Sequence, residues 1–185
     1  MSKLFVISGS SGVGKGTVIN RFLEKHPEFK LSISCTTRKI REGEKEGINY
    51  FFLSEDEFKK CIENNEFLEW AKFSGNSYGT KKTFVEKCMN AGENLILEID
   101  TQGAMSVKKI MPEAVLIFIT PPSIEELEHR LRGRHTETEE AIQKRLGSIK
   151  QEIENSKNFD YVIVNDTIEN AVEKLEQLML KIISS

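Results

Sequence analysis

Short apolar runs alternate along this chain with longer segments in which apolar residues recur every three or four positions. The short runs are typical of strands buried on both faces of a sheet, and the longer segments are typical of helices with one buried face. Five strands are predicted in this way: Leu4–Ser8, Leu31–Ser34, Leu95–Ile99, Val115–Thr120 and Tyr161–Val164. Because the two patterns alternate, the chain is predicted to adopt an α/β fold with a mostly parallel sheet.

Several of the predicted helices have recognisable ends. The helix after the first strand ends before Pro27 and is expected to bury Val18, Ile19, Phe22 and Leu23. A helix over Lys81–Ala91 is followed by Gly92, a favourable residue just past a helix end. Capping boxes are predicted at three starts: Ser54 with Glu57, Ser123 with Glu126, and Thr136 with Glu139. A final helix begins near Ile168 and is expected to bury Ala171, Val172, Leu175, Leu178, Met179 and Ile182.

Two stretches depart from this alternation and predict a division of the chain into three parts. Residues 35–80 carry two further β-like pieces, Tyr50–Leu53 and Phe67–Phe73, around a short helix, and are suited to hold a second substrate. Residues 127–157 are largely polar and bear arginines, which predicts a mobile helical lid. The core is then expected to consist of residues 1–34, 81–126 and 158–185.

The composition is that of an ordinary globular protein. The 185 residues favour one compact domain, with 38% hydrophobic and 30% charged residues. A net charge of −3 argues against general binding to nucleic acid or anionic membranes. Without a secretory signal or a long apolar run, the chain is expected in the cytoplasm. Its three cysteines and three histidines are scattered, which predicts reduced thiols and no zinc site.

A phosphate-binding loop is predicted directly after the first strand. It comprises Gly9, Ser10, Ser11, Gly12, Val13, Gly14, Lys15, Gly16 and Thr17. Its glycines let successive N–H groups face phosphate oxygens, the following helix adds its dipole, and Lys15 reaches the outer phosphates. Gly16 stands where a Ser or Thr usually follows the lysine, so Mg²⁺ is expected to contact Thr17 or to be held through water and phosphates. The alternative is a glycine-rich turn without a ligand.

The acceptor has to be inferred from other segments. Arg38 and Arg41 suit a monophosphate, because a planar guanidinium can bind phosphate through two N–H groups. Alone, such a pair would be read as solvated surface. The pair lies within Ser34–Glu44, and three further segments follow: Asn49–Phe52, Phe67–Ala71 and Gly75–Thr80.

Together these segments resemble the guanylate kinase family across essentially the whole chain. The resemblance rests on the order of the phosphate loop, Ser-x-Thr-Thr-Arg-x-x-Arg-x-Gly-Glu, Glu-Trp, Tyr-Gly-Thr, Ile-Asp-x-Gln-Gly and Gly-Arg-x-Thr-Glu. It implies a three-layer P-loop NTPase fold with a five-stranded parallel sheet, a small mixed α+β insertion that binds a nucleoside monophosphate, and a helical lid. It also implies the reaction ATP + GMP = ADP + GDP, with Mg²⁺ accompanying ATP.

Carried over to this sequence, the resemblance assigns the GMP site. The ligands of the GMP phosphate would be Ser34, Arg38, Arg41, Tyr50 and Tyr78. Glu69 would select guanine, because a carboxylate can accept from both N1–H and the 2-amino group, and adenine offers neither. Thr80 matches a hydroxyl that donates to guanine O6. The structural alternatives are a solvent-facing glutamate, half-buried tyrosines and ordinary turn hydroxyls.

Two polar residues follow predicted strands and have competing interpretations. Asp100 matches a family acid near both the magnesium and the guanine, and its alternative is an N-cap for the next helix. Asn165 matches a family position near the adenine of ATP, and its alternative is a plain turn.

Phosphoryl transfer requires neutralisation of charge more than covalent chemistry. The resemblance implies that Arg130, Arg134 and Arg145 fold over the phosphates when the lid closes. The catalytic residues would be Lys15, Arg38, Arg134 and Arg145. Arg132 is expected on the surface, and pairing with nearby glutamates is the alternative for the others. No general base is evident.

Two other functions are compatible with parts of the sequence. One is a binding module, since scaffold proteins carry guanylate-kinase-like domains that recognise phosphorylated peptides, but those have degraded phosphate loops and Lys15 is intact here. The other is a kinase for a sugar phosphate, which leaves Glu69 and Thr80 without a base to recognise. The expected partners are ATP and GMP, with no nucleic acid and no membrane, in a monomer or homodimer.

Overall fold

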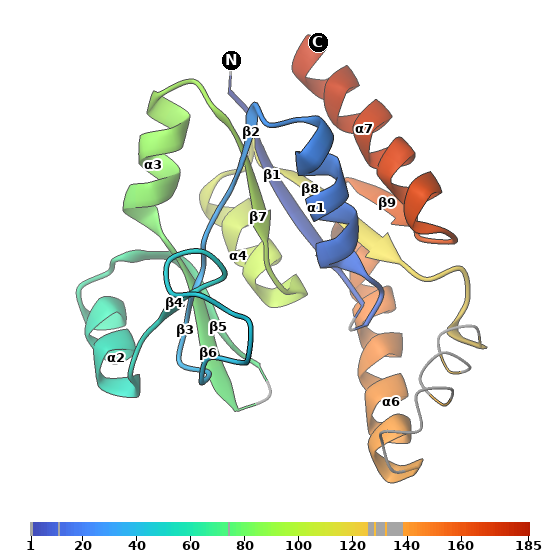
Figure 1. Ribbon diagram of the computed structural model, residues 1–185, viewed down its shortest axis with the longest axis horizontal. Helices are drawn as coiled ribbons and strands as arrows, with labels where there is room; N and C mark the ends of the chain where they lie inside the picture. Colours follow the sequence, from blue (N-terminus) through green and yellow to red (C-terminus); the bar gives the residue numbers. More distant parts are fainter. Residues whose placement is uncertain (1, 11, 74, 126–127, 129–131, 133–138) are drawn as a thin grey trace. The chain divides into compact units, whose positions relative to one another are not determined.

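A computed structural model of the chain describes residues 2–10, 12–73, 75–125, 128, 132 and 139–185 (Figure 1). The strands are β1 Leu4–Gly9, β2 Phe29–Leu31, β3 Cys35–Thr36, β4 Phe51–Phe52, β5 Phe67–Phe73, β6 Asn76–Lys81, β7 Asn94–Glu98, β8 Val115–Thr120 and β9 Tyr161–Val164. The helices are α1 Lys15–Lys25, α2 Glu55–Glu63, α3 Lys82–Asn90, α4 Thr101–Ile110, α6 Glu139–Asn155 and α7 Ile168–Ser184, with a 3₁₀ turn at Ser156–Asn158.

These strands form two sheets. The larger has five strands in the order β2-β7-β1-β8-β9, and β2 pairs with β7, and β8 with β9, in parallel. The smaller is mixed, in the order β4-β3-β6-β5, with β3 parallel to β4 and β6 antiparallel to both β3 and β5. The predicted α/β class, with a five-stranded parallel sheet and a small mixed insertion, is confirmed.

The chain divides into two compact units. Unit 1 comprises Met1–Phe5 and Glu28–Ala114, and unit 2 comprises Val6–Pro27 and Val115–Ser185. Unit 1 therefore carries the small sheet with helices α2, α3 and α4, and unit 2 carries helices α1, α6 and α7. The three-part division into core, insertion and lid stays a prediction.

One predicted strand was misplaced. The apolar run at 31–34 overlaps β2 only at Leu31. Ser32 N still donates to Ile96 O at 2.9 Å, but Ser34 O accepts from Phe51 N at 2.9 Å, so the chain has by then moved to the small sheet. A single apolar run thus spans the exit from one sheet and the approach to another, which periodicity alone cannot separate.

In unit 2 the predicted helices after the first strand and at the end of the sequence are confirmed as α1 and α7. Helix α1 buries Val18, Ile19 and Phe22, whereas Leu23 is only partly buried. Helix α7 buries Ala171, Val172, Leu175 and Met179, and leaves Leu178 and Ile182 partly buried. The two helices pack against each other, and Lys25 Nζ lies 3.2 Å from Glu176 Oε2.

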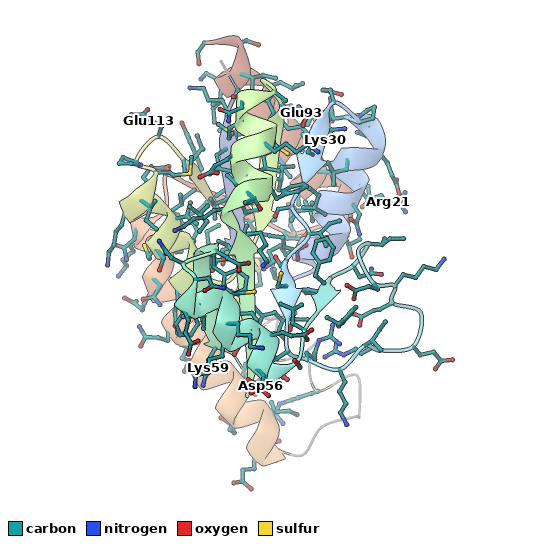
Figure 2. All side chains as sticks on the ribbon, turned by 90° about the vertical axis from the view of Figure 1, so that its left-hand side faces the viewer. Arg21, Lys30, Asp56, Lys59, Glu93 and Glu113 are labelled. Atoms are coloured by element: carbon teal, nitrogen blue, oxygen red, sulfur yellow. The ribbon has the colours of Figure 1, made fainter. Side chains whose placement is uncertain are left out.

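In unit 1 the capping box that begins α2 is confirmed. Ser54 Oγ accepts from Glu57 N at 3.2 Å, and Glu57 Oε2 accepts from Ser54 N at 2.8 Å. The other two predicted boxes include Glu126 and Thr136, which lie outside the described residues. Charged side chains lie on the outside of this unit, where Lys30 Nζ is 3.9 Å from Glu93 Oε1 (Figure 2).

Strand β6 was not predicted, because it contains a glycine and several polar residues that favour a turn. Its Gly79 is explained by packing, since a Cβ there would lie 3.0 Å from the ring of Phe67 on β5. Among the described residues, no helix is long and apolar enough to cross a membrane. The cytoplasmic location stays a prediction.

Candidate functional site

The predicted phosphate loop lies in unit 2, between β1 and α1. Gly12 and Gly14 have φ angles of 78° and 88°, a left-handed conformation that side chains rarely adopt, so both positions require glycine. Ser11 lies outside the described residues. The hydroxyl of Ser10 is buried and has no hydrogen-bond partner among the described atoms. An unpartnered hydroxyl within such a loop is suited to a phosphate oxygen.

Gly9 allows this loop to approach strand β8 closely. A Cβ at Gly9 would lie 2.5 Å from the backbone oxygen of Ile119, and Ser10 N donates to that same oxygen at 3.3 Å. This first glycine is therefore required by backbone packing, apart from any contact with phosphate.

Asn165 connects the end of β9 to the phosphate loop. Its buried side-chain amide donates to the backbone oxygen of Val13 at 2.6 Å. The same nitrogen would lie 3.2 Å from a Cβ at Gly14. Asn165 therefore supports the phosphate loop, which a residue in a plain turn would not do. Its contact with adenine stays a prediction.

In unit 1, Arg38 is held by an acidic partner to which the sequence analysis gave no role. Its Nη2 donates to Glu44 Oε1 at 2.7 Å, and its Nη1 donates to Glu44 Oε2 at 3.1 Å and to Lys39 O at 2.8 Å. The hydrogen bond from Arg38, followed by that from Arg41 N at 2.8 Å, lowers the pKa of Glu44. Glu44 therefore fixes one predicted phosphate ligand directly and the other through its backbone.

Two tyrosines complete this phosphate-binding end. The Arg38 guanidinium lies 5.3 Å from the ring centroid of Tyr50, and the rings of Tyr50 and Tyr78 are 6.1 Å apart. Burial is the first cause of a raised pKa at Tyr50, so the hydroxyl keeps its proton and can donate. Ser34 is partly buried nearby in the chain, and the Arg41 side chain is exposed. The structure brings Arg38, Tyr50 and Tyr78 together.

Glu69 is buried rather than solvent-facing, with 6% of its surface exposed. Its Oε1 accepts from Thr80 Oγ1 at 2.6 Å. The pKa of Glu69 is raised to about 7, first by burial and then by the nearby charge of Asp100, while the hydrogen bond from Thr80 opposes the rise. A buried carboxylate with one fixed oxygen keeps hydrogen-bonding capacity for a ligand.

Asp100 is the N-cap of α4, as its structural alternative predicted. Its Oδ1 accepts from Gly103 N at 2.7 Å. A Cβ at Gly103 would lie 2.5 Å from Glu69 Oε2, so the first turn of α4 faces the buried carboxylate. Gly103 had no assigned role in the sequence analysis, where it was one glycine in the Ile-Asp-x-Gln-Gly motif.

The small sheet places both ends of this site on one strand. Tyr78 and Thr80 are two residues apart on β6, so they share a face about 7 Å apart. Thr80 pairs with Glu69 on the neighbouring strand β5, and Tyr78 pairs with Thr36 on the other neighbour, β3. A phosphate-binding cluster and a buried carboxylate therefore lie side by side in unit 1.

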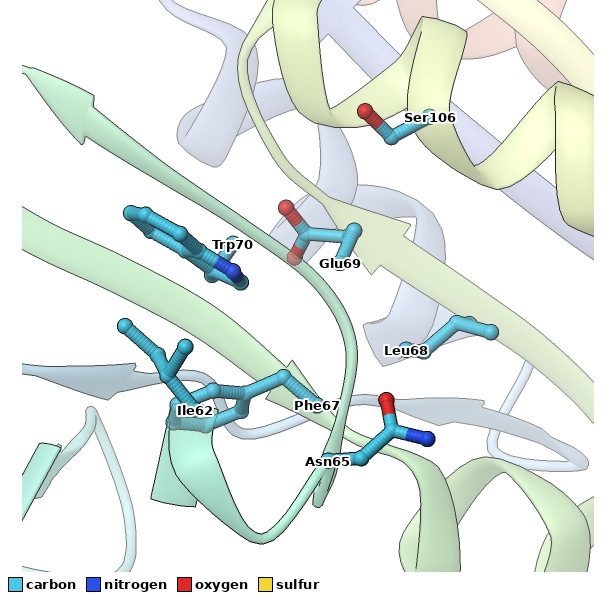
Figure 3. Close-up of a pocket in the computed structure, with 7 residues that line it drawn as sticks. All are labelled: Ile62, Asn65, Phe67, Leu68, Glu69, Trp70 and Ser106. Carbon is cyan, nitrogen blue, oxygen red and sulfur yellow. The ribbon is translucent and has the colours of Figure 1, made fainter. Parts of the chain in front are cut away.

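A cavity of about 240 Å³ adjoins this carboxylate (Figure 3). Its lining consists of Ile62, Asn65, Phe67, Leu68, Glu69, Trp70 and Ser106. Trp70, the second residue of the Glu-Trp motif, is 44% exposed.

Of the arginines in the predicted lid, the side chain of Arg132 is described and those of Arg130, Arg134 and Arg145 are not. Arg130 and Arg134 lie outside the described residues, as does the side chain of Arg145. Arg132 is exposed and pairs with Glu128 at 2.7 Å and with Glu139, in accord with the predicted surface position. No group of three His, Cys, Asp or Glu side chains that could hold a metal occurs among the residues described.

Comparisons with known proteins agree with this arrangement. The sequence profile of the family described as Guanylate kinase matches residues 1–182. The chain is 50% identical over 177 residues to a guanylate kinase of Prochlorococcus marinus, covering 96% of this chain and 94% of that protein. It is 51% identical over 177 residues to a guanylate kinase of Caldanaerobacter subterraneus subsp. tengcongensis, covering 96% and 86%.

A solved structure extends the likeness to the fold. The crystal structure of guanylate kinase from Anaplasma phagocytophilum superposes with a TM-score of 0.81 at 34% sequence identity, covering 97% of this chain and 85% of that one. With the phosphate loop, the arginine–tyrosine cluster and the buried glutamate in place, the chain belongs to the guanylate kinase family.

Proposed function

We propose that this chain catalyses ATP + GMP = ADP + GDP by direct in-line phosphoryl transfer, with ATP on the phosphate loop of unit 2 and GMP on the small sheet of unit 1. The observation that carries this proposal is the pair formed by Glu69 and Thr80, buried on the same sheet that holds Tyr78 and whose strand β3 leads directly to Arg38. One sheet then offers a base-selecting group and a phosphate-binding group to a single nucleotide.

Guanine selection follows from the chemistry of Glu69. Its ionised carboxylate accepts from guanine N1–H and the 2-amino group, whereas adenine would leave the buried charge without donors. Thr80 orients this carboxylate, since its hydroxyl proton is directed at Oε1. A hydroxyl has one proton, so donation to guanine O6, as first expected, requires Thr80 to release Glu69.

The acceptor phosphate is bound at the other end of the sheet. Arg38 and Arg41 neutralise its charge, and Tyr50 and Tyr78 donate through their hydroxyls. Ser34, in the segment that leads into β3, completes this set. The phosphate of GMP is anionic near neutral pH and can attack without a general base.

The donor phosphates are bound by the phosphate loop. Backbone N–H groups and the N-terminus of α1 hold them, with Ser10 adding its unpartnered hydroxyl. Lys15, together with Arg130, Arg134 and Arg145 of the lid, neutralises the charge that develops during transfer. Closure of the lid excludes water, which otherwise would hydrolyse ATP.

Mg²⁺ is proposed to enter with ATP. Oxygen donors suit this ion, which keeps several of its waters and takes few protein ligands. Thr17 offers an exposed hydroxyl in the first turn of α1, and Asp100 offers the carboxylate oxygen that does not cap α4. When bound, the ion would neutralise part of the negative charge on the transferred phosphate.

The test is ADP formation from ATP with GMP, AMP, UMP or no acceptor. Rapid ADP formation is expected only with GMP. Lys15→Ala should abolish it, and equal rates with and without GMP would exclude the proposed reaction. Glu69→Gln should lower the preference for GMP over AMP while leaving the KM for ATP unchanged.

A further inference from the structure

Gly103 leaves room for the carboxylate of Glu69 beside the first turn of α4. A Cβ built on Gly103 would lie 2.5 Å from Glu69 Oε2 and 3.2 Å from Glu69 Cδ. Ordinary van der Waals contact begins at 3.4 Å, so the nearer oxygen would have to retreat by about 0.9 Å. The φ angle of Gly103 is not in the left-handed region, so the backbone itself would accept alanine.

The surroundings restrict where either group could move. Glu69 is buried, and its other oxygen accepts from Thr80 Oγ1 at 2.6 Å. The Cβ position also lies 3.3 Å from Ile99 Cδ1. On the helix side, Gly103 N is held by Asp100 Oδ1 at 2.7 Å, so a retreat of the turn would weaken the cap of α4.

We propose that Gly103 is a positioning residue for base recognition: because it has no side chain, the Glu69 carboxylate lies against the N-terminal turn of α4 in the orientation that meets guanine. This inference deepens the proposed function and rests on it, since Glu69 selects a base only where GMP is the acceptor. The N-terminal turn of α4 also stabilises a carboxylate placed beside it.

The prediction concerns selectivity rather than phosphate binding. In Gly103→Ala the displaced carboxylate loses its alignment with the two guanine donors, and a hydrogen bond to a charged group contributes about tenfold or more. We expect the ratio of kcat/KM for GMP to that for AMP to fall at least about tenfold. The KM for ATP should stay within about twofold, because the phosphate loop carries its own contacts.

A double-mutant cycle separates this role from general damage to α4. In a Glu69→Ala background no carboxylate meets the new methyl group, so adding Gly103→Ala should change the GMP:AMP ratio less than about twofold. Gly147→Ala in α6 serves as the control for thermal unfolding, because a Cβ there meets nothing within 4 Å.

Each outcome decides the inference. A GMP:AMP ratio retained in Gly103→Ala, or an equal fall of the ratio in the Glu69→Ala background, would overturn it. If Gly103→Ala does not fold, Glu69→Ala/Gly103→Ala should still fold, because the clash between the methyl group and the carboxylate is then absent. Failure of both variants to fold would also overturn the inference. Wild-type protein that forms ADP no faster with GMP would instead remove the proposed function, while the unfolding measurements would still report the contact.

Discussion

The carboxylate of Glu44 holds the guanidinium of Arg38 with both of its oxygens, at 2.7 and 3.1 Å. One of these oxygens also accepts from Arg41 N at 2.8 Å, so a single acidic side chain organises both arginines of the segment. The Arg38 side chain is 11% exposed and lies over the Tyr50 ring. Glu44 and the Lys39 carbonyl take three of its five N–H groups, and the other two can donate to a ligand. Glu44 thus orders the phosphate-binding end before a substrate arrives.

Glu44→Gln is therefore expected to weaken the binding of GMP. The amide can accept only one of the two guanidinium hydrogen bonds, so Arg38 and the backbone of Arg41 lose their fixed positions. We expect the KM for GMP to rise about tenfold, with the KM for ATP unchanged. Steady-state kinetics with each substrate varied would measure both.

Glu42→Gln is the matched control, because it removes the same charge from an exposed position two residues away. If the two variants raised the KM for GMP equally, a general charge effect would explain the result and the positioning role of Glu44 would be wrong. A lower KM for GMP in Glu44→Gln would show that Glu44 competes with the phosphate.

The raised pKa of Glu69, about 7, predicts a pH dependence of GMP use. Only the ionised carboxylate accepts from both guanine donors, so kcat/KM for GMP should rise as the pH increases through about 7. The GMP phosphate itself loses a proton near pH 6, and this titration contributes to the pH profile of wild type and of Glu69→Gln alike. Glu69→Gln should keep that contribution and lack the titration near 7, and superimposable profiles would contradict the assignment.

The same carboxyl group predicts how stability changes with pH. Its pKa rises from 4.5 when unfolded to about 7 when folded, so the folded state binds more protons between these values. Stability therefore falls as the pH rises across this interval, by up to about 3 kcal/mol. In urea unfolding, the free energy of unfolding of Glu69→Gln should increase relative to that of wild type between pH 5 and pH 8. A constant difference between the two proteins would show that the carboxyl group titrates normally.

Periodicity located β1, β7, β8 and β9 of the large sheet and misplaced β2. The signal was clearest for β1, β7 and β8, whose residues are mostly buried. The runs at Val115–Thr120 and Tyr161–Val164 coincide with β8 and β9. It missed β6, in which Gly79 and polar neighbours occupy a strand because Phe67 packs against the glycine. Pairing across the small sheet, rather than local preference, determines this strand.

The candidate site was predicted best where a residue type has one evident chemistry. Arg38, Tyr50 and Tyr78 were expected to meet, and they do. Glu44 and Gly103 were not found, because their roles depend on partners that spacing does not reveal: a guanidinium folded back onto the segment and a carboxylate from another strand. The sequence placed Asn165 near ATP, but its hydrogen bond to Val13 was not predicted, since the two residues are 152 positions apart in the sequence.

Asn165→Asp tests whether that contact holds the phosphate loop. The substitution replaces a donor with an oxygen that faces the Val13 carbonyl at 2.6 Å, inside a buried site. Repulsion between two acceptors should destabilise the protein by about 2–4 kcal/mol at pH 8 and raise the KM for ATP. The new carboxyl group can donate again when protonated, so its folded pKa is raised and the loss should be smaller at pH 5 than at pH 8. Asn158→Asp adds the same charge at an exposed position and should show little loss at either pH. An equal loss at both pH values in Asn165→Asp would mean that the amide does not act by donating to Val13.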